Sequence, residues 1–181
     1  MTAQFREILI LDGERISMAF CPPLPPHHPR VVELTAEEIY ALRKRALEDS
    51  KSEGEEVLCS EFDLILGSTA CWRRYVGTWE MRDGHLFLTS IEGRFKLIGT
   101  EPLLTDWFTG VLRVPRGEML AYVHMGFGSV YEEELHIHVE RGRVTSTRVY
   151  DNRGKEIDTR RIGVANLPGS ENRFPGNRDF N

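Results

Sequence analysis

Two histidines lie two residues apart in a stretch of alternating polar and apolar residues, His136-Ile137-His138. Side chains at this spacing in a β-strand point to the same face, and that face would also carry Glu132, Glu134 and Glu140. Together with a carboxylate or His124, the two imidazoles would form a zinc site, which needs three or four converging ligands. Spacing alone brings only the two histidines together. We therefore favour a solvent-facing strand surface and keep a metal site at His136 and His138 as the alternative.

Aromatic residues gather in the middle of the chain, with Arg73 and Arg74 between the first of them. They are Trp72, Tyr75, Trp79, Trp107, Phe108, Tyr122, Phe127 and Tyr131. Aromatics beside arginine are common at binding hot spots, but they also fill the core of small β-domains. We favour the core for any single aromatic. A binding surface, where there is one, is predicted to use Trp72, Arg74, Tyr75, Trp79, Trp107, His124 and Tyr131.

The triplet Gly77-Thr78-Trp79 resembles the Gly-x-Trp signature of the lipocalins and related ligand-binding barrels. The resemblance covers these three residues. In that family the signature lies in the first barrel strand, near the start of the chain, whereas here it begins only at position 77. We assign the chain to no family on this basis, but the resemblance implies a small apolar ligand as one alternative.

Three other patterns are interpreted as structural. Ser68-Thr69-Ala70-Cys71 offers nucleophiles, and His85 or His124 is the nearest candidate base, but the nucleophile elbow G-x-S-x-G is missing. Gly126-Phe127-Gly128-Ser129 lacks the lysine of a phosphate-binding loop and is predicted to join two strands. The proline-rich residues 21–29 contain P-x-x-P but favour a stiff connector.

The elements that position these residues are predicted to be mainly β-strands. Apolar runs flank turn-forming residues four times, which indicates four hairpins. Their strands cover 5–10 with 15–20, 71–81 with 86–91, 110–114 with 119–124, and 131–139 with 144–150. A further buried strand is predicted at Phe62 to Leu66, and an edge strand ending near Val164. The pattern predicts an antiparallel meander, either an open sheet or an open barrel.

One N-terminal helix is predicted over residues 36–49. Thr35 and Glu38 have the spacing of a capping box, and Leu34 with Ile39 that of a hydrophobic staple. Ile39, Leu42 and Ala46 then follow as an apolar stripe, which predicts packing against one face or end of the sheet. The fold class is therefore α+β. We expect a single domain over 1–165 and a loosely ordered tail over 166–181.

The composition favours a soluble cytoplasmic protein. The formal net charge of −5 disfavours binding to nucleic acid, which needs a basic surface. The chain lacks an apolar run of about 20 residues that could cross a membrane. Its three cysteines, Cys21, Cys59 and Cys71, are unpaired in number and show no C-x-x-C spacing, which fits a reducing compartment.

Two functions follow as hypotheses. The first is a protein-binding module without a cofactor, such as a toxin-neutralising immunity protein or an accessory subunit, because an acidic surface around aromatics suits a basic partner. The second is a small-molecule-binding protein or enzyme with an aromatic-lined pocket, with metal assistance from His136 and His138. The sequence leans away from an enzyme because it contains no complete catalytic motif.

Overall fold

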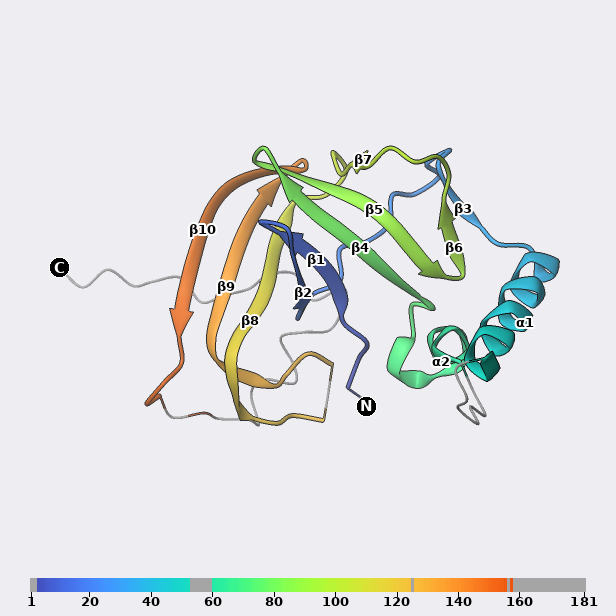
Figure 1. Cartoon of the computed structure of the whole chain (residues 1–181). Coiled ribbons are helices and arrows are strands. Elements are labelled where there is room, and N and C mark those ends of the chain that lie inside the picture. Colours follow the sequence, from blue (N-terminus) through green and yellow to red (C-terminus); the bar gives the residue numbers. More distant parts are fainter. Residues whose placement is uncertain (1–2, 53–59, 125, 156, 158–181) are drawn as a thin grey trace.

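The computed structural model describes residues 3–52, 60–124, 126–155 and 157, and it has an α+β fold (Figure 1). Within these residues eight strands form one curved sheet in the order β2-β1-β4-β5-β10-β9-β8, with β7 paired to β5. The strands are β1 Glu7–Leu11, β2 Glu14–Met18, β4 Tyr75–Arg82, β5 His85–Gly93, β7 Leu103–Leu104, β8 Gly110–Ala121, β9 Val130–Glu140 and β10 Arg143–Asp151. Two short strands, β3 Val31–Glu33 and β6 Phe95–Leu97, pair with each other.

The sheet curls until its two edges approach each other. The amide of Ala19, directly after β2, donates to the carbonyl of Arg113 in β8 at 2.8 Å. The inner face of the resulting open barrel holds the main core, which includes Leu9, Trp79, Leu88, Leu112 and Ile137, all at 0–1 % exposure. Large apolar side chains from five strands therefore fill the centre of the barrel.

Three of the four predicted hairpins are confirmed: β1–β2, β4–β5 and β9–β10. Each has a two-residue turn in which both residues have positive φ: Asp12-Gly13, Asp83-Gly84 and Arg141-Gly142. Such turns match the right-handed twist of the flanking strands, so local turn chemistry fixes these pairs. In the second hairpin, β4 begins at Tyr75 rather than at Cys71, which lies in the 3-10 helix η1 Thr69–Cys71.

The predicted hairpin over residues 110–124 is wrong, because Gly110–Ala121 is one strand, β8. The residues predicted as its turn, Pro115 to Glu118, pass through a bulge opposite β9. At the bulge Gly117 has φ +74°, and the Glu132 carboxylate of β9 accepts a hydrogen bond from the Glu118 amide at 3.1 Å. Between Arg116 and Met119, β8 has one residue more than the facing part of β9. The bulge accommodates this residue, so the strand continues instead of reversing.

The predicted antiparallel meander holds for most of the sheet, but β1 and β4 pair in parallel. Leu9 lies opposite Trp79 and Leu11 opposite Met81 in this register. A parallel pair needs a long crossover. Residues 19–74 supply it, and they include both helices.

The predicted strand at Phe62 to Leu66 is also wrong, because these residues form the helix α2 Glu61–Gly67. Ser60 and Asp63 make a capping box: the Asp63 amide donates to Ser60 Oγ, and the Ser60 amide donates to the Asp63 carboxylate. Ile65 packs with Cys71 and Val76 in a small second cluster against the outer face of β4. The capping box starts the helix, and Ile65, from the apolar run that predicted a strand, is the buried residue of that helix.

The predicted N-terminal helix is confirmed as α1 Ala36–Ser52, and its capping box forms through Thr35 and Glu38. Its apolar stripe is less buried than predicted, since Leu42 is 40 % exposed. Ion pairs hold α1 instead, from Lys96 to Glu38 and from Arg43 to Asp63. Figure 1 shows α1 beside α2 and away from β8–β10.

No helix in the described part of the chain is long and apolar enough to span a membrane. The predicted edge strand ending near Val164 reaches beyond the described residues, and the predicted tail 166–181 lies wholly outside them.

Candidate functional site

Strands β8, β9 and β10 form an arm of the sheet that joins the remaining strands at one end (Figure 1). On one side, β10 pairs with β5 only at Arg143 and His85, next to the turns of their hairpins. On the other side, the Ala19–Arg113 hydrogen bond links the backbone of the β2 edge to β8. Away from these links, part of the inner face of the arm reaches solvent, as the exposed Arg116 and Thr147 show.

A hollow of about 260 Å³ lies where the arm separates, and we call it the hairpin pocket. Its lining comes from β1 and its turn, β4, β8, β9 and β10: Leu11, Asp12, Met81, Arg116, Leu135, Ile137, Val144 and Thr147. Leu135 and Ile137 are buried and form the inner part, whereas Leu11, Met81 and Val144 are half-buried. The pocket is therefore apolar inside, with a carboxylate, a guanidinium and a hydroxyl among its exposed residues.

Arg116 continues the inner face of β8. Leu112 and Val114 precede it on that face, opposite Ile137 and Leu135, and both are buried. Arg116 is exposed, and among the described residues it has no hydrogen bond or ion pair. The residue opposite it on β9, Glu133, is bound by Arg153. The pocket thus contains a cation whose charge no described side chain neutralises directly.

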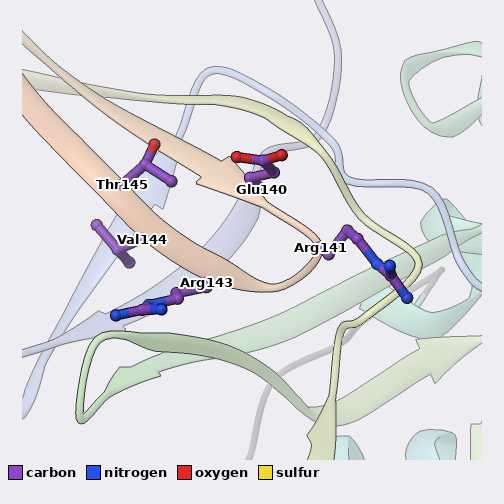
Figure 2. Close-up of a pocket in the computed structure, with 5 residues that line it drawn as sticks. All are labelled: Glu140, Arg141, Arg143, Val144 and Thr145. Carbon is purple, nitrogen blue, oxygen red and sulfur yellow. The ribbon is translucent and has the colours of Figure 1, made fainter.

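A second hollow, of about 430 Å³, lies on the surface at the β9–β10 turn (Figure 2). Glu140, Arg141, Arg143, Val144 and Thr145 line it. Figure 2 shows the side chains of Arg141 and Arg143 directed away from each other, so they do not converge on one point. Apart from the half-buried Val144, these residues are exposed. The hairpin pocket is smaller, but buried side chains form its inner part, and we regard it as the candidate site.

At the starts of β1 and β4, away from the Leu11 and Met81 ends that line the pocket, Glu7 of β1 and Arg73 form a buried ion pair. The Glu7 carboxylate is 0 % exposed and accepts from Arg73 Nε at 2.8 Å, from the Gly77 amide at 2.6 Å and from Trp79 Nε1 at 2.8 Å. Burial raises the pKa of Glu7, although Arg73 and the hydrogen bonds oppose the rise. We call these residues, Glu7, Arg73, Gly77 and Trp79, the closed end.

The closed end explains the Gly-x-Trp triplet without a ligand. A Cβ on Gly77 would lie 2.5 Å from Glu7 Oε2 and 2.7 Å from Trp79 Nε1. Glycine is needed there because the carboxylate and the indole occupy that space. The triplet positions an internal acceptor and its donors, and Trp79 itself is fully buried.

The thiols near the closed end are poorly suited to nucleophilic catalysis. Burial raises the pKa of Cys21, and it also raises the pKa of Cys71, so the thiolate forms are disfavoured. The Cys71 thiol donates to the Tyr75 carbonyl at 3.3 Å. The structure places Cys71 in a packing role within the small cluster beneath α2.

The outer face of the arm carries the predicted pair of histidines in different settings. His136 Nε2 lies 2.8 Å from Glu134 Oε2, and Arg113 donates to both oxygens of the same carboxylate. Burial would raise the pKa of Glu134, but the His136 and Arg113 hydrogen bonds outweigh it and lower the pKa to about 2. His138 Nε2 is buried without a hydrogen-bond partner. In the part of the chain described, no three His, Cys, Asp or Glu side chains gather to hold a metal.

The aromatic residues predicted as one binding surface lie in several places. Tyr75 and Trp79 are buried; Trp107 donates to the Pro23 carbonyl, Tyr131 accepts from Arg6, and Trp72 is 56 % exposed. His124 lies near the Tyr122 hydroxyl in the β8–β9 loop, and Arg74 is exposed before β4. None of these residues lines the hairpin pocket, whose lining contains no aromatic side chain.

The sequence analysis missed the pocket residues. A signal was present in Leu112, Val114 and Arg116, which alternate as one strand face on which the third residue is charged. The predicted turn at Pro115 to Glu118 concealed it. Comparison with known proteins adds no assignment: this chain matches no family model, no curated protein and no solved structure.

Proposed function

We propose that this protein binds a small molecule with an apolar group in the hairpin pocket and does not transform it. The observation that carries the proposal is the hollow itself: the apolar lining of Leu11, Met81, Leu135, Ile137 and Val144 lies where the sheet separates. Apolar surface in such a hollow gains free energy when a ligand displaces water, at about 25 cal/mol for each Å² buried.

The size and chemistry of the pocket limit the ligand. Its volume of about 260 Å³ lies just under the range of about 300–1,000 Å³ that is typical of ligand pockets. A short alkyl chain or a single ring suits this space. The lining residues include no imidazole and no thiol, which supports binding without nucleophilic or histidine-based acid–base chemistry.

The proposal is tested with octanol, an uncharged molecule with a flexible apolar chain. In two-dimensional NMR titrations we expect octanol to shift the backbone amide signals of Leu135 and Ile137. The exposed Thr147 lines the pocket, so Thr147→Trp should fill its mouth and remove these shifts. Ser146→Trp is the matched control, because Ser146 is exposed and lies opposite His138, on the other face of β10.

Two results would contradict the proposal. One is the absence of saturable shifts in the wild-type protein. The other is equal loss of binding in both tryptophan variants, because a general disturbance of β10 would then explain the result rather than occupation of the pocket.

Protein binding is a second candidate function, favoured by exposed apolar side chains at the end of β8. Met119 is 50 %, Leu120 41 % and Tyr122 60 % exposed. Large apolar side chains that are exposed close together in the sequence are one feature of interaction sites. Glu118 is exposed beside them, and the chain is acidic, which favours a basic partner.

This second candidate predicts that immobilised protein retains a basic protein from an extract of the source cells and releases it when salt is added. Leu120→Asp should abolish retention, whereas Leu64→Asp, which alters a similarly exposed leucine on α2, should not. Retention of the same proteins by the Leu120→Asp variant would exclude the β8 surface.

A further inference from the structure

Arg116 is an exposed cation at the end of a buried apolar face, and no described hydrogen bond or ion pair holds it there. Leu112 and Val114 precede it on the inner face of β8, are buried and lie opposite Ile137 and Leu135, whereas Arg116 lies opposite Glu133. The guanidinium lies at the pocket without a described partner. An unpaired cation beside apolar side chains is a recognition element for an anion attached to an apolar group.

We infer that the ligand of the hairpin pocket is a small amphipathic carboxylate, with its apolar part against Leu135 and Ile137 and its carboxylate on Arg116. This inference rests on the proposed function and specifies its ligand. A planar guanidinium can donate two parallel hydrogen bonds to one carboxylate, which fixes orientation as well as charge.

The charges around Arg116 favour a single negative charge on the ligand. Glu133 and Asp151 lie on the same inner face but are both bound by Arg153. Asp12 also lines the pocket and has no described partner, so its negative charge opposes any anion there. One available guanidinium facing one carboxylate suits a monoanion, whereas a phosphate dianion would be repelled more strongly.

Asp12 has a structural reason for its identity, and Arg116 does not. Asp12 is the first residue of the Asp-Gly turn between β1 and β2, with φ 52°, a conformation that aspartate adopts more readily than most residues. The turn therefore accounts for the carboxylate in the pocket. Because the turn explains Asp12 and no described contact explains Arg116, we infer an acid as the ligand and not an amine.

The test compares three molecules with the same chain length: octanoate, octanol and octylamine. At neutral pH and low salt, octanoate should bind the wild-type protein about tenfold more tightly than octanol, as expected for one charge-assisted contact. Arg116→Gln should weaken octanoate binding about tenfold and octanol binding much less, because only octanoate carries a charge. Arg15→Gln is the control, because it removes the same charge from an exposed β2 residue outside the pocket lining.

A second variant should strengthen octanoate binding instead of weakening it. Asp12→Asn should strengthen octanoate binding about twofold, because it removes a like charge from the pocket mouth. If octylamine binds more tightly than octanoate, or if Arg116→Gln changes octanoate and octanol binding equally, the inference is wrong and the proposed function stands. If none of the three molecules binds, the proposed function and the inference both fail.

Discussion

The closed end and the hairpin pocket lie in the same barrel, but the charged groups of the first are buried and paired, whereas those of the second are exposed and have no described partner. At the closed end, the Glu7 carboxylate has three donors within 2.8 Å and no exposed surface. At the pocket, Arg116 and Asp12 are exposed and have no described partner. One region uses its charges to hold strands together, and the other leaves charges and apolar side chains available to a ligand.

This difference separates residues that matter for stability from residues that matter for binding. A buried charge that loses its partner is strongly destabilising, because the remaining charge stays out of water. An exposed charge without a partner loses little when it is replaced. The predictions below test whether the two regions differ in this way, beginning with the largest effect.

Glu7→Ala should lower the free energy of unfolding by about 3–5 kcal/mol, because Arg73 would remain buried without its counter-charge. Urea unfolding followed by tryptophan fluorescence measures the loss. Replacing both partners, Glu7→Met with Arg73→Met, should be less destabilising than Glu7→Ala alone. Equal losses in the single and the double variant would contradict the buried pair as the origin of the effect.

Glu134 provides a pH test on the outer face of the arm. Its pKa is lowered from 4.5 to about 2, so its contribution to stability is present above pH 4.5 and is lost as the pH falls through about 2. That shift corresponds to at most about 3 kcal/mol. Glu134→Gln should therefore flatten the loss of stability in this range, measured by urea unfolding at successive pH values. Glu140→Gln, at an exposed position of the same strand, should keep the wild-type profile.

The parts of the fold that the sequence predicted correctly depend on local chemistry. The turns Asp12-Gly13 and Arg141-Gly142 set their hairpins through backbone conformation alone. The capping box of Thr35 and Glu38 likewise sets the start of α1. A second capping box, Ser60 with Asp63, starts α2, where the apolar run from Phe62 to Leu66 had predicted a strand. Short apolar runs fit a strand or a helix, and here the cap decides.

The parts that were missed depend on contacts between distant segments. The parallel pairing of β1 with β4 joins residues about seventy positions apart, which no local pattern indicates. The bulge in β8 needs the Glu132 carboxylate from β9. The turn predicted at Pro115 to Glu118 puts Arg116 in a loop, and only the contact with β9 shows that it continues the strand to the pocket.

Gly77→Ala tests how tightly the closed end is packed, because it adds a single methyl group there. The added Cβ would overlap the Glu7 carboxylate and the Trp79 indole, so the internal hydrogen bonds must shift. Overpacking of this kind costs about 1–3 kcal/mol, to be measured by urea unfolding. Gly67→Ala is the matched control, because a Cβ there meets nothing within 4 Å. A Gly77→Ala protein as stable as the wild type would show that the closed end tolerates rearrangement.

Arg116→Gln should have the smallest effect on folding, a change within about 0.5 kcal/mol in the free energy of unfolding, because no described contact is lost. The substitution removes a positive charge from the mouth of the pocket but leaves Leu135 and Ile137 packed as before. Urea unfolding of this variant beside Glu7→Ala compares the two regions directly. A loss of several kcal/mol from Arg116→Gln would mean that the guanidinium supports the arm itself. Its role as an available binding group, and with it the contrast between the two regions, would then be lost.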